Sequence, residues 1–171
     1  GVNHITGFNY ISKKVYKIKV KSNEIDFIIN TKSSSVYSPQ DNSIYITGGI
    51  HQSNKSDESK KFLKLEFSLS ANNNEITYQI KNLSEMKNKR SFHSSILYNN
   101  DSYLIIIGGK SISKCEVYCF KNNKWFEISS LPDDLKTNNC SLCVINDNLY
   151  CFNISNNNLT ETIFRLGLKN F

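Results

Sequence analysis

The 171-residue chain has little of what disordered linkers and membrane spans are made of. It contains two prolines and seven glycines, and its longest purely apolar run is the few residues around Ile105 to Ile107. A run this short excludes a transmembrane helix, and residues 1–16 lack the charged-then-apolar layout of a signal peptide. We therefore expect one domain with its own core. We also expect it to lie inside the cell, in the cytoplasm or cytoskeleton, with no membrane contact.

Arginine is nearly absent, although the formal net charge is +6: of 21 basic residues only Arg90 and Arg165 are arginines. Nucleic-acid recognition typically uses a concentrated, arginine-rich stripe, so nucleic acid is not an expected partner. Most lysines are interpreted as solvated residues on strand faces. The alternative is a basic patch that binds an acidic partner.

The cysteines number five, an odd count without a clear pairing pattern, which indicates a reducing compartment. Cys140 and Cys143 form a C-x-x-C motif inside the strand-like run CSLCVI. Their odd spacing places the two side chains on opposite faces of a strand, and no second pair completes a tetrahedral site. Ordinary core cysteines are expected, with no metal and no cofactor.

Residues 90–132 form the clearest unit of the sequence. Four apolar-rich runs, separated by Asn, Asp and Lys turn signals, predict an antiparallel meander. The pair Gly108 and Gly109 closes the second run. The predicted strands cover residues 91–98, 103–107, 115–120 and 125–128.

Partial copies of this unit precede and follow it. Upstream, two short runs again end on a glycine pair, Gly48 and Gly49, and a long polar loop leads to two more predicted strands. At the C-terminal end, Asn153 and Ile154 stand where the glycine pair is expected, so this copy is degenerate. The predicted division is an outer half-unit at 1–32, a full unit at 33–89, the best-matching unit at 90–136 and a partial unit at 137–171.

The central unit resembles a kelch repeat. The pattern is an arginine, a His-Ser pair, a diglycine, a Tyr and Trp six residues apart, and a closing Leu-Pro. In this sequence these are Arg90, His93-Ser94, Gly108-Gly109, Tyr118, Trp125 and Leu131-Pro132. The resemblance implies an all-β, kelch-type β-propeller fragment made of four-stranded antiparallel blades. In the preceding unit Tyr78 stands for the tryptophan.

Both motif classes also have a physical reason. Glycines after an inner strand let the backbone turn sharply and approach a neighbouring blade, while Tyr118 and Trp125 fill the widening space between blades. A propeller has roughly 4 to 8 blades, so we expect further blades from the same or another polypeptide.

The resemblance implies a non-catalytic protein-interaction or scaffold module that presents loops at a propeller face. The alternatives are a substrate receptor of a ubiquitin ligase and, less favoured, a propeller enzyme. A copper oxidase needs convergent histidine and tyrosine ligands, and His4, His51 and His93 show no ligand spacing. The prediction is therefore that the chain is not an enzyme.

Two segments are the candidate partner-binding sites. The polar insertion at 51–61 contributes His51, Lys60 and Lys61, and the segment at 86–91 contributes Lys87, Lys89 and Arg90. Arg90 is also a candidate structural anchor. Both segments could present positive charge to an acidic or cytoskeletal protein.

Overall fold

The computed structural model describes residues 4–9, 14–19, 30–51, 57–69, 76–110, 112–132, 140–154 and 161–169. Their regular secondary structure consists of β-strands alone, so the expected all-β class is confirmed. Within these residues, no helix has the length and apolar character that a membrane crossing requires. The strands are β1 (His4–Asn9), β2 (Lys14–Lys19), β3 (Ser34–Ser38), β4 (Ser43–Thr47), β5 (Phe62–Leu69), β6 (Ile76–Asn82), β7 (Ser94–Tyr98), β8 (Tyr103–Ile107), β9 (Cys115–Cys119), β10 (Lys124–Ile128), β11 (Ser141–Ile145), β12 (Asn148–Ile154) and β13 (Glu161–Gly167).

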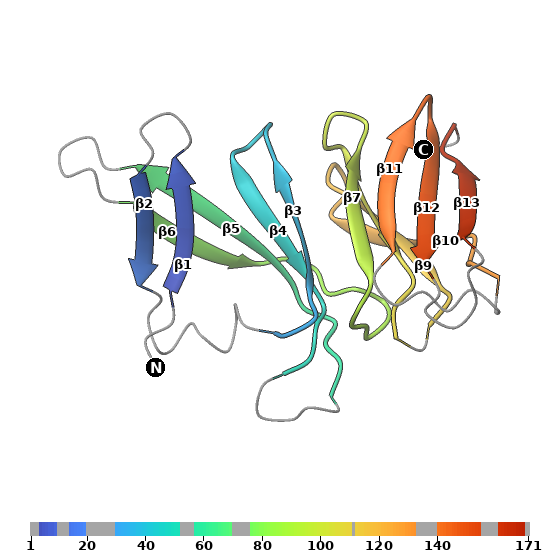
Figure 1. Ribbon diagram of the computed structural model, residues 1–171, viewed down its shortest axis with the longest axis horizontal. Coiled ribbons are helices and arrows are strands. Elements are labelled where there is room, and N and C mark those ends of the chain that lie inside the picture. Colours follow the sequence, from blue (N-terminus) through green and yellow to red (C-terminus); the bar gives the residue numbers. More distant parts are fainter. Residues whose placement is uncertain are drawn as a thin grey trace.

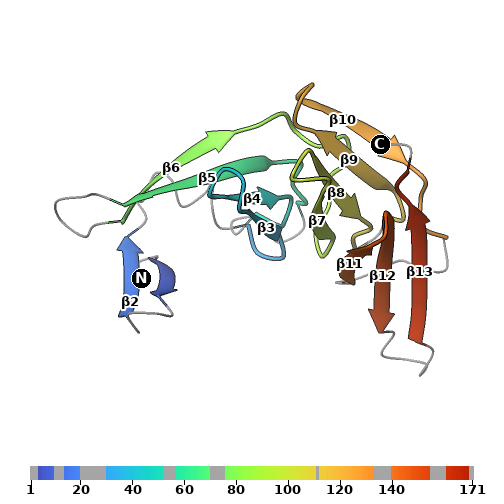
Figure 2. The ribbon, with the colours of Figure 1, turned by 90° about the horizontal axis from the view of Figure 1, so that it is seen from above.

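The strands form antiparallel sheets in chain order, as in a partial β-propeller. Strands β3 to β6 and β7 to β10 make two four-stranded meanders, β11 to β13 make a three-stranded sheet, and β1 pairs with β2. The sheets stand side by side along the molecule (Figure 1). Seen from above they form an arch, with β3, β7 and β11 on its concave side and the later strands of each sheet on its convex side (Figure 2).

Burial explains why the strands of the central sheet are easy to recognise in the sequence. Strand β8 has neighbouring sheets on both of its faces, so Leu104 to Ile107 are all buried, at 2% exposure or less. A strand buried on both faces is a continuous apolar run. Strand β4 instead alternates buried and half-buried residues along Ser43–Thr47, which is the period of two expected of a half-buried strand.

Two hydrophobic cores fill the spaces between the sheets. The first interface, between β3–β6 and β7–β10, is largely aromatic: it buries Tyr45, Phe62, Met86, Leu104, Ile106, Tyr118 and Trp125. The second interface, between β7–β10 and β11–β13, is aliphatic and rich in cysteine: it buries Ile105, Ile107, Cys115, Val117, Leu131, Cys140, Leu149, Cys151 and Leu168.

Trp125 is 7% exposed, in agreement with the expected place of the aromatic residues between blades. Its ring lies 5.2 Å from the ring of Phe62 and 5.0 Å from that of Tyr118, between centroids. The indole Nε1–H donates to the carbonyl of Ser84 at 2.6 Å, so burial leaves its one polar group paired.

The two glycine pairs occupy equivalent places, each directly after the second strand of a four-stranded sheet, as predicted. All four glycines have positive φ, from 58° at Gly48 to 145° at Gly109. A Cβ on Gly48 would overlap the carbonyl oxygen of Arg90 and lie 2.6 Å from Cε1 of His93. Both conformation and space therefore require glycine there.

Aspartates at the tips of the first hairpins tie each sheet to the one before it. Asp101 accepts a hydrogen bond from the hydroxyl of Ser38 at 2.6 Å, and Asp147 accepts one from the hydroxyl of Tyr98 at 2.9 Å. The same contact thus recurs at both interfaces, which supports reading the sheets as consecutive units of one repeat.

Two sequence expectations require correction or extension. In the half-unit expected at 1–32, strand β1 was not predicted; it pairs with β2, and residues 20–29 lie outside the described part of the chain. The ladder also shifts the tryptophan position of the preceding unit: Leu65 and Ile80 stand where Tyr118 and Trp125 stand. Tyr78 lies two residues nearer the turn, because β5 and β6 are longer than β9 and β10.

Candidate protein-recognition face

The connector, residues 83–93, joins β6 to β7 and organises the loops at one end of the sheets. Its backbone is bonded to the loop that follows β4: Met86 N donates to the carbonyl of Lys60 at 3.0 Å and Arg90 N to that of Ser59 at 3.1 Å. Gly49 N in turn donates to the carbonyl of Arg90 at 2.9 Å. The base of the polar insertion is thereby fixed against the connector.

The same connector holds two further segments. Phe92 N donates to the carbonyl of Lys32, and Lys110 N donates to the carbonyl of Ser91, both at 2.9 Å. Lys32 precedes β3 and Lys110 follows β8, so segments far apart in sequence meet around residues 90–92.

A buried carboxylate, Glu116 on β9, fixes the middle of the connector. It accepts hydrogen bonds from the backbone N–H groups of Lys87 at 2.8 Å and Asn88 at 3.0 Å, and from the Asn88 amide at 2.9 Å. Arg90 Nη2 lies 2.6 Å from the same carboxylate. Bonds to a charged acceptor are stronger than neutral ones, so Glu116 sets the path of the connector.

Arg90 is not a partner-contacting residue, which corrects one candidate from the sequence. Its side chain is fully buried, and Nη1 donates to the carbonyls of Gly108 at 2.7 Å and Lys114 at 2.9 Å. A buried charge requires a charged partner and hydrogen bonds, and the Arg90 guanidinium finds both inside the fold. Its role is that of a structural anchor.

The preceding sheet uses a different residue in this place. Asn30 corresponds to Arg90 in the repeat, and its Nδ2 donates to the carbonyl of Gly48 at 3.0 Å, as Arg90 does to Gly108. Neither Asn30 nor Glu116 was singled out from the sequence. For Glu116 the signal was an acid within the strand-like run CEVYC, flanked by apolar residues on both sides.

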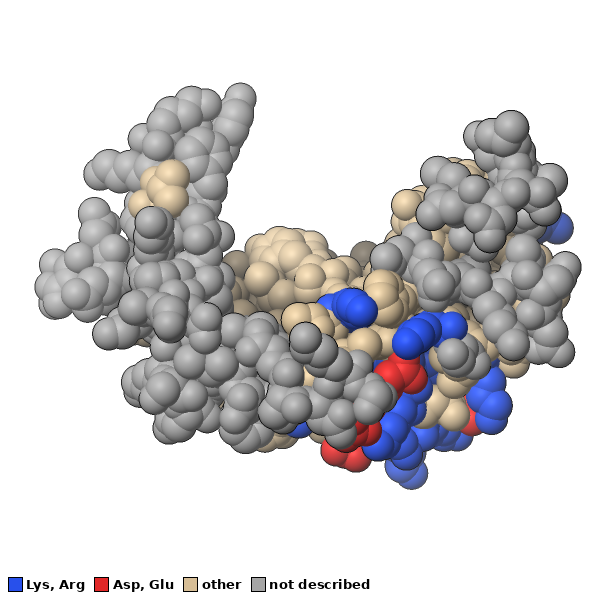
Figure 3. Space-filling model, turned by 60° about the horizontal axis from the view of Figure 1, so that its bottom comes forward, with Lys and Arg blue, Asp and Glu red and all other residues tan. Residues whose placement is uncertain are grey.

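Five lysines surround the connector, and we name them the lysine face. Lys32, Lys87, Lys89 and Lys110 are exposed and Lys60 is half-buried. Figure 3 shows basic side chains gathered on this end of the molecule, with acidic side chains between some of them. One of the five has an exposed acidic partner, since Lys89 Nζ lies 2.8 Å from Asp57. That contact raises the pKa of the Lys89 ammonium group, so its charge is retained.

The remaining predicted residues lie at the base of the insertion. His51 is half-buried and its N–H donates to the carbonyl of Asp57 at 3.4 Å. Lys61 is half-buried and its carbonyl accepts from Gly48 N at 2.9 Å. Residues 52–56 lie outside the described part of the chain, and a binding role for this loop stays a prediction.

His93 is a neutral, buried residue behind this face. Burial, and secondly the positive charge of Arg90, lower the pKa of His93 to about 3. Its Nε2 shares a hydrogen bond of 2.8 Å with the hydroxyl of Thr47. The histidine therefore ties β4 to the start of β7 and carries no charge near neutral pH.

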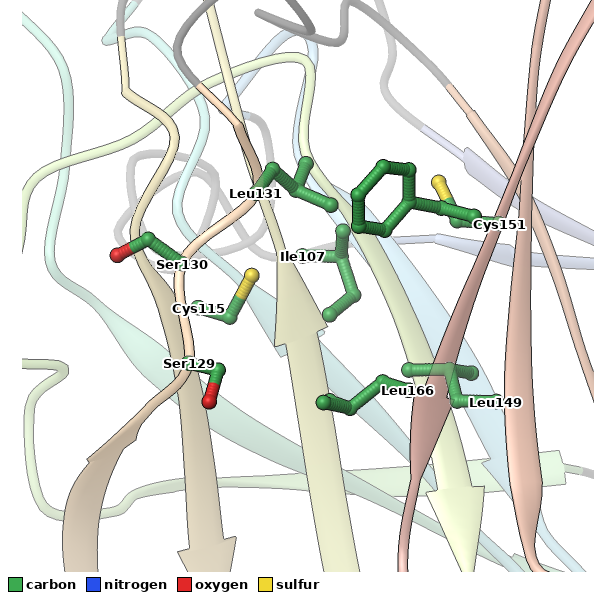
Figure 4. A pocket seen from close by; sticks show the side chains of 9 residues that line it. Ile107, Cys115, Ser129, Ser130, Leu131, Leu149, Cys151 and Leu166 are labelled. Carbon is green, nitrogen blue, oxygen red and sulfur yellow. The ribbon is translucent and has the colours of Figure 1, made fainter.

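A small cavity lies at the second interface, away from the lysine face. Its lining is mainly apolar, with Cys115 and Cys151 on facing sheets and Ser129 and Ser130 at one side (Figure 4). Its volume of about 30 Å³ is far below that of a typical small-molecule pocket. Among the residues that the structure describes, no group of three or more His, Cys, Asp and Glu is arranged to hold a metal ion.

Comparison with known proteins supports the fold and leaves the family open. No family model and no curated protein matches the sequence. A solved structure described as a fungal alcohol oxidase of the AA5 family in complex with copper is similar at 14% identity and a TM-score of 0.61, over 80% of this chain and 30% of that one. The structure of YjhT is similar at 16% identity and a TM-score of 0.53, over 74% of this chain and 35% of that one. The chain thus matches about a third of the length of each of these two structures.

One of these findings corrects the prediction that the chain is not an enzyme. The arrangement of sheets read here as a binding scaffold is also that of a copper-bound alcohol oxidase, so the fold gives no ground for excluding catalysis. At 14% identity the similarity shows the fold alone.

Proposed function

We propose that the chain is a protein-recognition segment of a propeller, whose lysine face binds an acidic surface of a protein partner. The observation that carries the proposal is the convergence of Lys32, Lys60 and Lys110, from three separate segments, on the connector that itself carries Lys87 and Lys89. A kelch-type scaffold or a substrate receptor of a ubiquitin ligase would use such a face.

Rigid presentation favours recognition over simple solvation. The lysines extend from backbone that is bonded to residues 86–92, and this connector is held by the buried Glu116. Each exposed lysine contributes little to affinity by itself. A fixed group of them creates a field that steers an acidic partner and gives specificity.

Charge reversal with a matched control tests the proposal. Lys87→Glu, Lys89→Glu and Lys110→Glu would be combined in one variant. The control variant combines Lys121→Glu, Lys124→Glu and Lys169→Glu, which are exposed residues outside the lysine face and change the net charge equally.

The probe is a fluorescent glutamate-rich peptide, titrated by anisotropy at two salt concentrations. We expect the first variant to weaken binding at least about tenfold and the control about twofold or less, with affinity falling as salt rises. Equal losses in both variants would indicate attraction by net charge alone and would overturn the proposal.

A second candidate function is a propeller enzyme, because a similar fold occurs in the copper-bound alcohol oxidase. Elemental analysis of the protein purified after copper supplementation separates the two. Stoichiometric copper together with alcohol-dependent oxygen consumption would replace the recognition proposal.

A further inference from the structure

We propose that Phe92, with Lys32 above its ring, forms a seat for an apolar side chain carried by the acidic partner segment. The inference rests on the proposed function and deepens it: the preferred ligand is an acidic peptide that contains an aromatic residue among its carboxylates.

Phe92 and Lys32 occupy equivalent positions in consecutive sheets. The first hairpins of the two sheets correspond, since Ser38–Ser43 and Tyr98–Tyr103 are their last cross-strand pairs. Counting back along the chain from Ser38 and Tyr98, Lys32 and Phe92 fall at the same point, just before the inner strands β3 and β7. Both therefore lie at the end of the strands that line the concave side of the arch (Figure 2).

Both residues have left-handed backbone conformation, with φ of 62° at Lys32 and 54° at Phe92. Every other positive-φ residue in the described part of the chain is Gly, Asn or Asp, the types that adopt this region at low cost. For a bulky aromatic residue the conformation is strained. Such strain persists where the surroundings impose it, and it is concentrated at functional sites.

The surroundings hold the ring in place. Phe92 N donates to the carbonyl of Lys32 at 2.9 Å, and Lys32 Nζ lies 4.4 Å from the centroid of the Phe92 ring. Lys110, bonded through its backbone to Ser91, lies on the other side of the same short segment. A half-buried ring thus lies beneath the Lys32 ammonium group at the lysine face.

This arrangement favours a partner segment that has both acidic and aromatic side chains. Carboxylates pair with the ammonium groups of Lys32 and Lys110, while the ring offers an apolar contact that a uniformly acidic segment leaves unused. Seating an aromatic side chain on Phe92 removes apolar area of both from water and adds a ring–ring contact. The seat therefore converts general attraction for acidic chains into preference for one kind of sequence.

The test uses two short glutamate-rich peptides that differ only in a central residue, Phe or Ser, titrated against the protein by fluorescence anisotropy. We expect the Phe peptide to bind about tenfold more tightly than the Ser peptide. Phe92→Gly should remove this preference and leave the affinity for the Ser peptide unchanged. Glycine suits the positive φ, so the variant keeps the fold, which thermal unfolding verifies.

Phe126→Ser is the matched control, because Phe126 is an exposed aromatic residue on the outermost strand β10; it should keep the preference. Equal affinity of the parent for both peptides would overturn the seat and leave the acidic-partner proposal standing. Absence of binding to either peptide would overturn both.

Discussion

The two interfaces between sheets are built on the same ladder but packed with different chemistry. At the first interface the rings of Tyr45, Phe62, Tyr118 and Trp125 fill the space, whereas aliphatic and cysteine side chains fill the second. By cross-strand register, Leu166 stands in the third sheet where Tyr118 stands in the second, and Phe164 where Glu116 stands.

The difference shows what the repeat requires. Sheet order, hairpin register and the aspartate contacts at the hairpin tips are common to both interfaces. The buried ion pair joins two residues of the unit at 90–136, and the aromatic cluster lies between this unit and the preceding one. Packing between the sheets thus requires side chains that fill the space and strands whose side chains alternate between the two faces. The Arg90–Glu116 pair instead holds the connector that carries the lysine face.

Breaking that pair should have the largest effect. Glu116→Ala leaves the buried Arg90 guanidinium and the N–H groups of Lys87 and Asn88 without their acceptor. Removing one partner of a buried pair costs about 3 to 5 kcal/mol, so we expect a loss of this size in the free energy of unfolding, measured in urea. Phe164→Ala, at the equivalent position, removes a half-buried side chain and should cost clearly less. Similar losses for the two variants would contradict the assignment of a special role to the ion pair.

Trp125→Ala removes the largest side chain of the aromatic interface and should destabilise the protein by about 3 to 5 kcal/mol. Leu149→Ala is the counterpart at the aliphatic interface, where a buried leucine is worth about 2 to 5 kcal/mol. Unfolding midpoints of both variants compare the interfaces directly. An unchanged midpoint for Trp125→Ala would mean that the indole is a surface contact.

The glycines offer a sharper comparison. Gly48→Ala places a Cβ against backbone and His93 at a positive φ, and we expect a loss of at least about 1 to 3 kcal/mol from strain alone. Nothing lies within 4 Å of a Cβ added to Gly167 on β13. Gly167→Ala should therefore be neutral or stabilise by up to about 1 kcal/mol, and thermal unfolding of the two variants checks the contrast.

The pH dependence of the unfolding free energy tests the burial of His93. Its folded pKa of about 3 lies below the unfolded value of 6.5, so the unfolded chain binds the proton first as the pH falls. The contribution of the neutral, buried His93 to stability is fully present above pH 6.5 and is lost toward pH 3. The unfolding free energy changes by at most about 1.4 kcal/mol per pH unit over this range. His93→Gln should flatten the unfolding free energy between pH 6.5 and 5. A variant with the parent's slope would show that His93 is accessible to protons in the folded state.

Much of the fold could be predicted from the sequence because the signals are local. Alternation and turn residues placed most strands of the central sheets, and the glycine pairs marked the ends of β4 and β8. The register between strands was harder to predict. Tyr78 was placed at the Trp125 position from sequence spacing, whereas the lengths of the strands and of the turn together determine which residues pair.

The site was harder to predict because its members lie far apart in the chain. Lys87 and Lys89 were identified as charged residues of the segment at 86–91, but the contributions of Lys32 and Lys110 depend on backbone bonds to the connector. Glu116 resembles a solvated strand residue until Arg90 is placed beside it. Arg90 itself was a candidate both for the partner-binding face and for a structural anchor, because a charged residue carries no sign of its burial in the sequence.

The central claim is that consecutive sheets pack face to face through the aromatic cluster, and a double-mutant cycle between Phe62 and Trp125 tests it most directly. Phe62 lies on β5 of one sheet and Trp125 on β10 of the next, with ring centroids 5.2 Å apart and planes inclined by 69°. Unfolding free energies of Phe62→Leu, Trp125→Leu and the double variant should give a coupling of about 0.5 to 1.5 kcal/mol. Strict additivity would contradict the packing of the two sheets.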